Sequence, residues 1–132
     1  MTDIEVLFLY RLKQAEETLL DSEKMLKAGV SPKSITNRAY YSMFYSLLAL
    51  FLRYGVEIKT SKHIGVISVF DKEFVQAKKI DKYYSEILHK MFNARQKGDY
   101  KDLIVVTIAD AESHVKMASE FVMEIKKLIE KV

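Results

Sequence analysis

A chain of 132 residues is long enough for a single domain, residues 1–132, that buries a core without the support of disulfides or metals. Its 49% hydrophobic and 30% charged residues exclude a disordered chain, and the absence of cysteine excludes a disulfide framework, a thiolate metal site and a cysteine nucleophile. The net charge of +3 is uneven, because residues 31–102 carry 13 basic and 7 acidic groups. That surplus could attract phosphate or could only keep exposed helices soluble.

The first expected helix runs from about residue 3 to residue 28. Thr2 and Glu5 have the spacing of a capping box, which satisfies the unpaired amides at a helix start. Gly29 can adopt the left-handed conformation that ends a helix. Apolar or small residues recur in steps of three and four and predict one buried stripe, formed by Phe8, Leu12, Ala15, Leu19, Ser22 and Leu26.

The second expected helix runs from about residue 32 to residue 54 and ends at Gly55. Ser31 is a favoured N-cap, and Pro32 suits the first helical position because it has no amide to leave unpaired. Residues 39–52 carry no charge, so the centre of this helix is apolar on all sides. The run is shorter than the roughly 20 residues that cross a bilayer, and we expect a central core helix and no membrane association.

Three further helices complete the pattern. Apolar residues at helical spacing predict a short helix over 63–74, and a fourth helix is expected from a cap at Asp81 through Arg95, ended by Gly98. Thr107 and Asp110 resemble another capping box, which starts a fifth helix that runs to the C-terminus. Helices joined by short connections pack antiparallel, so we predict an all-α, up-and-down antiparallel helical bundle of about five helices.

Common catalytic and metal motifs are missing from the sequence. The three histidines fall in three different expected helices, and the spacing Glu86-x-x-His89 occurs once where a di-iron bundle needs it twice. No phosphate-binding glycine loop or nucleophile elbow is present. We therefore expect no metal and no cofactor.

Two polar clusters remain as candidate sites. Arg38, Tyr41 and Tyr45 share one side of the second helix, where Arg38 could hold a phosphate or pair with a carboxylate such as Asp99 as a structural clasp. Arg95, Asp99 and Tyr100 form the second cluster. There Arg95 could hold a phosphodiester during cleavage by the ribose 2′-hydroxyl, or it could simply complement the dipole at a helix end.

An ordered set of segments across nearly the whole chain resembles the HEPN domain family, in its stand-alone archaeal and bacterial branch. The segments are Asn37-Arg38-Ala39-Tyr40-Tyr41-Ser42-Met43-Phe44-Tyr45, Lys59-Thr60-Ser61-Lys62-His63 with Phe70, Arg95-Gln96-Lys97-Gly98-Asp99-Tyr100, and Ala118-Ser119-Glu120-Phe121-Val122. The resemblance implies a helical bundle that commonly dimerises, with a functional groove at the two-fold interface. The uncharged surface of the second helix would suit such an interface.

The resemblance also bears on catalysis. Ribonuclease members of the family carry Arg, four to six residues and then His, and act without a metal. Arg95 matches the Arg, but the positions for the His hold Tyr100, Lys101 and Asp102. A phenol or an amine does not readily replace imidazole at neutral pH, and His63 can replace it only if the fold brings it to Arg95. In related pairs a nucleotidyltransferase modifies a tyrosine of the toxin, which makes Tyr100 a candidate target.

These observations leave three functional interpretations. The first is a homodimeric, cytoplasmic HEPN-like module that binds nucleotide or RNA phosphate without cleavage, using Asn37, Arg38 and Arg95 with nearby tyrosines, in a toxin and antitoxin pair with a nucleotidyltransferase. The second is a metal-independent endoribonuclease toxin in which Arg95 stabilises the transition state and His63 or Tyr100 moves a proton. The third is a structural adaptor that only docks onto a separate nucleotidyltransferase.

Overall fold

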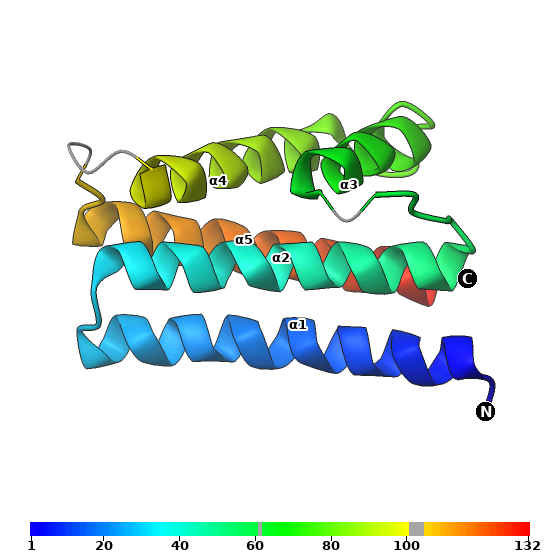
Figure 1. The fold of residues 1–132 in the computed structure, drawn as a ribbon, viewed down its shortest axis with the longest axis horizontal. Helices are drawn as coiled ribbons and strands as arrows, with labels where there is room; N and C mark the ends of the chain where they lie inside the picture. The colour runs from blue at the N-terminus through cyan, green and yellow to red at the C-terminus, as the bar shows by residue number, and fades with distance from the viewer. Residues whose placement is uncertain (61, 101–104) are drawn as a thin grey trace.

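The chain folds into an antiparallel bundle of helices. The computed structural model describes residues 1–60, 62–100 and 105–132, with backbone only for residues 97–100. Across these ranges the elements are α1 (Asp3–Ala28), α2 (Pro32–Tyr54), α3 (His63–Phe70), a π-helical turn η1 (Asp71–Val75), α4 (Lys82–Tyr100) and α5 (Ile108–Glu130), with no strand in the part described. The long helices run up and down beside one another (Figure 1), which confirms the predicted fold class.

The ends of α1 and α2 form at the predicted residues, although the Glu5 side chain does not complete the capping box expected with Thr2. The Thr2 hydroxyl accepts a hydrogen bond of 3.1 Å from the backbone N–H of Glu5, and the Ser31 hydroxyl accepts from the first turn of α2. Gly29 and Gly55 follow the two helices with φ of 73° and 67°, the left-handed region that costs glycine little. Both expected ranges, 3–28 and 32–54, are therefore confirmed.

The third helical segment changes type along its length. We expected one helix over 63–74, but α3 is followed from Asp71 by a π-helical turn, in which the N–H of Gln76 donates to the Asp71 carbonyl at 2.8 Å. The spacing of five residues defines such a turn. The Asp71 carboxylate accepts a hydrogen bond of 2.6 Å from the Ser85 hydroxyl and lies 2.6 Å from Nε2 of His89. Both partners belong to α4, so these contacts fasten the turn to that helix.

The fourth helix is longer than expected, and the prediction that Gly98 ends it is wrong. The helix passes through Gly98 and continues to Tyr100. An interior glycine costs a helix only about 1 kcal/mol relative to alanine, so it does not end a helix by itself. At the start of α5, the Thr107 hydroxyl accepts from the Asp110 N–H at 3.1 Å and the Asp110 carboxylate accepts from the Thr107 N–H at 3.0 Å, which confirms the capping box.

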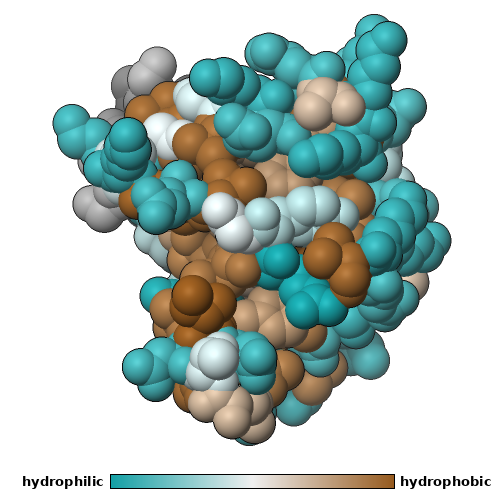
Figure 2. Space-filling view, turned by 90° about the vertical axis from the view of Figure 1, so that its right-hand side faces the viewer, coloured by the Kyte–Doolittle hydropathy of each residue, from teal (hydrophilic) through white to brown (hydrophobic). Residues whose placement is uncertain are grey.

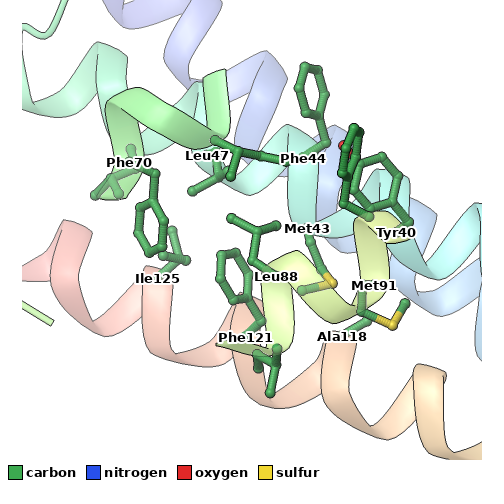
Figure 3. Close-up of a cluster of buried hydrophobic side chains, with 14 of the residues drawn as sticks. Tyr40, Met43, Phe44, Leu47, Phe70, Leu88, Met91, Ala118, Phe121 and Ile125 are labelled. Carbon is green, nitrogen blue, oxygen red and sulfur yellow. The ribbon is translucent and has the colours of Figure 1, made fainter. Parts of the chain in front are cut away.

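The core is built around α2, which contacts each of the other four α-helices. Its apolar residues Met43, Leu47 and Leu50 are fully buried. Side chains from α3, α4 and α5 meet them in one cluster (Figure 3). Most of the uncharged run therefore packs inside the single chain, and its use as a dimer interface stays a prediction for the residues that remain partly exposed, Tyr41, Tyr45, Leu48 and Leu52.

An apolar surface is exposed at another place, on the N-terminal half of α1. Ile4, Val6, Leu7 and Leu9 are all exposed there, Ile4 at 62%. The end of the bundle that carries both termini shows apolar surface between hydrophilic side chains (Figure 2). None of the helices in the described ranges is long and apolar enough to span a membrane.

Candidate phosphate-binding site

Arg95 connects α4 to the polar end of α2. Its Nε donates to the Asn37 side-chain oxygen and its Nη2 donates to the Tyr41 hydroxyl, each at 3.3 Å. Asn37 and Tyr41 are four residues apart and so lie on one face of α2. The guanidinium carbon also lies 5.4 Å from the ring centroid of Tyr41 and 5.7 Å from that of Tyr40, distances typical of cation–π contacts. The fold thus places Arg95 among three polar residues of the segment that carries the family resemblance.

The hydrogen bonds of Arg95 to α2 are long. At 3.3 Å both exceed the usual 2.7–3.2 Å range for a nitrogen donor, so each is weak. Arg95 has further interactions beyond these contacts. A charged phosphate oxygen forms shorter and stronger hydrogen bonds to guanidinium, so a ligand could compete with the two neutral acceptors for this side chain.

A hollow of about 330 Å³ opens beside Arg95, and we call it the first hollow. It is lined by Met25, Ser34, Asn37, Arg38, Tyr41 and Tyr45. The prediction that Arg38, Tyr41 and Tyr45 share one side of α2 is therefore confirmed. Arg38 is exposed and forms no hydrogen bond or ion pair with the part of the chain that the structure describes. The proposed clasp between Arg38 and Asp99 cannot be placed, because the side chains of Asp99 and Tyr100 lie outside that part.

His63 reaches the same region from the start of α3. Its Nδ1 lies 2.8 Å from the Tyr40 hydroxyl, a hydrogen bond whose donor depends on the histidine tautomer. The ring stacks on Phe44 with centroids 4.1 Å apart and meets the edge of Tyr41 at 5.5 Å. These contacts hold the imidazole in a fixed orientation. The fold therefore does bring a histidine from elsewhere in the sequence close to Arg95.

A second hollow, of about 480 Å³, is where His63 and Arg95 meet. It is lined by Lys62, His63, Ile64, Phe92, Arg95 and Gln96. Among the described residues that line the first and second hollows, three are basic and none is acidic. Both hollows therefore favour an anion.

The protonation states follow from burial and from Arg95. Burial lowers the pKa of His63, and the positive charge of Arg95 lowers it further, so the imidazole is neutral at pH 7. Burial raises the pKa of Tyr40 well above its usual value, although Arg95 acts in the opposite direction. Tyr40 therefore keeps its proton, and the pair is a neutral phenol beside a neutral imidazole.

A glycine determines how closely the loop before α3 approaches the helix. A Cβ added to Gly65 would lie 2.2 Å from Cγ2 of Thr60, far inside van der Waals contact. The Thr60 hydroxyl accepts a hydrogen bond of 3.1 Å from the Lys62 backbone N–H, which fixes that side chain. Gly65 thus allows the loop to fold against α3 and positions His63, the first residue of the helix.

Sequence reasoning missed several residues of this region. Tyr40 was part of the family segment, but its hydrogen bond to His63 joins residues 23 positions apart and has no periodic signal. Lys62 and Gln96 line the second hollow and were given no role. In the described ranges no group of three or more His, Asp or Glu side chains is arranged to hold a metal ion.

The comparisons with known proteins confirm the family resemblance of the sequence. Residues 8–128 match the HEPN domain family, and the chain belongs to that family. A UPF0332 protein of Thermotoga maritima is 35% identical over 130 residues, covering 98% of this chain and 96% of that protein. Two proteins of Methanocaldococcus jannaschii are also similar. "Putative toxin MJ0142" is 32% identical over 89% of this chain and 78% of its own length, and "Putative toxin MJ0605" is 36% identical over 89% and 85%.

Proposed function

We propose that the protein binds a phosphate group of RNA or of a nucleotide at Arg95. The observation that carries this proposal is the position of the Arg95 guanidinium, which forms long hydrogen bonds to Asn37 and Tyr41 and lies beside two hollows whose described lining residues include no acidic side chain. Arg is suited to phosphate because its planar donors can grip two oxygens at once. Arg38, exposed on the first hollow, would supply a second positive charge.

The names of the relatives support a toxin-like role for this binding. Two similar proteins carry the name "Putative toxin", and each is matched over most of its length. We therefore propose a homodimeric HEPN module that acts in a toxin and antitoxin pair with a nucleotidyltransferase. The exposed apolar residues of α1, such as Ile4 and Leu7, provide a surface that a partner or a second copy would bury.

Equilibrium binding to single-stranded RNA tests the proposal. The fluorescence anisotropy of a labelled hexa-adenylate is measured in EDTA for the wild type, for Arg95→Ala and for the double variant Arg38→Ala with Arg95→Ala. We expect the single change to weaken binding about tenfold or more, the effect of about 1.4 kcal/mol for a charged hydrogen bond. Lys90→Ala, which removes an exposed cation of the same helix, is the matched control. Unchanged affinity in the double variant would overturn the proposal.

A second function, metal-independent cleavage of RNA, is favoured by the place of His63. The Nδ1 atom is hydrogen-bonded to Tyr40, whereas Nε2 has no such partner among the described residues. None of the buried side-chain polar atoms in the described residues lacks a partner, so Nε2 is not buried, and His63 is one of the residues that line the second hollow. A neutral imidazole beside an arginine has the properties of a general base next to an electrostatic stabiliser.

The chemical step would proceed as follows. In the tautomer whose Nδ1–H donates to the Tyr40 hydroxyl, Nε2 of His63 accepts the proton of a ribose 2′-hydroxyl, the freed oxygen attacks phosphorus, and the bond from phosphorus to the 5′-oxygen breaks. Arg95 stabilises the charge on the phosphoryl oxygens, and the leaving 5′-oxygen takes a proton from water. The hydroxide that remains removes the proton from the His63 imidazolium, which restores the neutral base. The products carry a 2′,3′-cyclic phosphate and a 5′-hydroxyl.

Incubation with a mixed-sequence RNA in EDTA separates the two functions. Cleavage that leaves 2′,3′-cyclic phosphate ends and disappears in both His63→Ala and Arg95→Ala would establish the enzyme. Intact RNA with the wild type, together with binding that depends on Arg95, would establish a binding module. If the protein binds no RNA but a nucleotidyltransferase co-purifies with it, the adaptor function is favoured.

A further inference from the structure

A further hollow lies between the N-terminal half of α1 and the last turns of α2, and we call it the α1 hollow. It has a volume of about 500 Å³ and shares no lining residue with the two hollows beside Arg95. Its walls come from α1, from α2 and from the loop that follows α2. Six aliphatic side chains line these walls, Ile4, Leu7, Leu48, Leu52, Val56 and Ile58.

The buried face of α1 is left uncovered at this hollow. Ile4, Ala15 and Ser22 are 11 and 7 residues apart, which is close to whole numbers of helical turns, so the three residues lie on one face of α1. Ala15 and Ser22 are fully buried, whereas Ile4 is 62% exposed. The core-facing stripe of α1 therefore continues to a residue that is not covered. An open apolar face of this kind marks a place where a binding partner or ligand belongs.

Two charged residues, Arg11 and Glu57, also line the α1 hollow. Arg11 is half-buried, and its Nη1 donates a hydrogen bond of 2.9 Å to the neutral side-chain oxygen of Gln14. It forms no ion pair with the residues that the structure describes. A carboxylate can accept two parallel hydrogen bonds from a guanidinium and binds it more strongly than a neutral amide does. Glu57 is exposed, so water and salt screen its repulsion of an anion at Arg11.

We infer that the α1 hollow binds the anion of a fatty acid, which has a single carboxylate on an unbranched aliphatic chain. The chain packs against the aliphatic walls and the carboxylate contacts Arg11. The volume falls in the range of small-molecule pockets, which are mostly apolar and hold a few polar groups that fix the orientation of the ligand. This inference does not depend on phosphate binding at Arg95.

The ligand leaves another apolar face of α1 open to a protein partner. Val6, Leu9 and Tyr10 are all exposed and do not line the hollow. They are three and four residues apart where the helix geometry brings them together, on the side of α1 that points away from Ile4. A partner can therefore cover this face while the hollow is occupied.

Titrations with small amphiphiles test the chain and the carboxylate separately. NMR of the isoleucine, leucine and valine methyl groups measures the affinities of octanoate, decanoate and octan-1-ol below their micelle concentrations. Decanoate should bind at least about tenfold more tightly than octanoate, because each buried methylene contributes a factor of about four. Octan-1-ol should bind about tenfold more weakly than octanoate, because it lacks the charged hydrogen bonds to Arg11. An apolar hollow without that contact would favour the alcohol, which has no charge to desolvate.

Two pairs of variants locate the site. Arg11→Met removes the charge and keeps an unbranched stem, so it should weaken octanoate about tenfold and leave octan-1-ol unchanged. Lys13→Met, which removes an exposed cation from another side of α1, is its control. Leu7→Trp places a larger side chain in the hollow and should abolish the binding of both, whereas Leu9→Trp should not. Urea denaturation checks that the four variants remain folded.

The other possible occupants give different results. Octan-1-ol that binds as tightly as octanoate, or octanoate that binds Arg11→Met as well as the wild type, would overturn the contact with the carboxylate. Decanoate that does not bind, or that binds Leu7→Trp equally well, would overturn the hollow as its site. If decanoate does not bind and sedimentation velocity finds a wild-type dimer that Leu7→Trp separates, a second copy of the chain is the occupant. Loss of RNA binding in Arg95→Ala bears only on the proposed function.

Discussion

Two histidines are held in the same local way at two places in the molecule. His63 has its Nδ1 2.8 Å from the Tyr40 hydroxyl, and His114 has its Nδ1 2.8 Å from the Thr36 hydroxyl. Burial is the largest cause of a lowered pKa in both imidazoles. Judged by the hydrogen bond and burial alone, the two sites are equivalent.

The charges around the two histidines differ. The positive charge of Arg95 lowers the pKa of His63 further, whereas Asp110 raises that of His114 and Lys90 lowers it. The hollow beside His114 therefore combines an acid with a base, whereas the described lining beside His63 contains no acid. A mixed environment suits internal packing, and a purely basic one suits an anionic ligand. The comparison shows that the arginine, not the buried imidazole, marks the candidate site.

Charge reversal should produce the largest difference between the two regions. Arg95→Glu replaces the central cation by an anion, so the affinity for hexa-adenylate should fall by about 100-fold, since like charges placed together cost several kcal/mol. Lys90→Glu, the same change beside His114, should lower affinity by about threefold at most because exposed charges are screened. Anisotropy titrations in EDTA measure both. Similar losses in the two variants would mean that net charge, not this site, controls binding.

Gly65→Ala should disturb only the His63 region. The new methyl group would lie 2.2 Å from Thr60, and relief of that overlap should cost about 1–3 kcal/mol of unfolding free energy. Urea denaturation measures the loss. Amide resonances near His63 should shift while those near His114 stay in place, and shifts spread evenly over both regions would contradict a local role for this glycine.

Removal of the Thr36 hydroxyl and removal of the Tyr40 hydroxyl should lower the unfolding free energy by different amounts, because His114 is buried and His63 is half-buried. Thr36→Val leaves His114, which is only 8% exposed, without its partner, at a cost of about 1–3 kcal/mol of unfolding free energy. Tyr40→Phe leaves His63 next to solvent, which can replace the lost bond, so about 0.5–1.5 kcal/mol is expected. Urea titrations rank the two variants. Only Tyr40→Phe should also alter RNA affinity. A larger loss of unfolding free energy in Tyr40→Phe than in Thr36→Val would contradict the view that His114 is the more buried histidine.

The smallest expected effect is on the pKa values of His63 and His114 and on the pH dependence of stability that follows from them. Because the folded pKa of each histidine lies below the unfolded value of about 6.5, stability is complete above that pH and falls as the pH drops from about 6.5 towards the folded values. Arg95→Ala should raise the pKa of His63 but keep it below 6.5, because burial remains. NMR titration of the ring protons should find the pKa of His114 unchanged in this variant. A shift of both would indicate a general loosening of the fold.

The helices were predictable because their signals are local. The caps at Thr2, Ser31 and Thr107 and the glycines that follow α1 and α2 act within one turn of the chain, where sequence spacing equals spatial neighbourhood. Gly98 was misjudged because a glycine ends a helix only when its surroundings favour the left-handed conformation. The π-helical turn at Asp71 was also beyond prediction, since its partners Ser85 and His89 lie on a later helix.

The candidate site was predictable only in part. Arg38, Tyr41 and Tyr45 share a face because they are three and four residues apart on one helix. The bonds of Arg95 to Asn37 and Tyr41 span more than 50 residues and depend on how α4 packs against α2. The approach of His63 depends in addition on the loop before α3. Helical periodicity carries no information on contacts between residues of different helices. The sequence therefore suggested the candidate residues but not the contacts between them.

The most direct test of phosphate binding at Arg95 is an NMR map of hexa-adenylate on the wild-type protein. We predict that the largest chemical-shift changes fall on Asn37, Tyr41, His63 and Arg95, while Lys90 and His114 remain unaffected. Changes centred on His114, or none at saturating RNA, would contradict the assignment of Arg95 and its two hollows as the binding site.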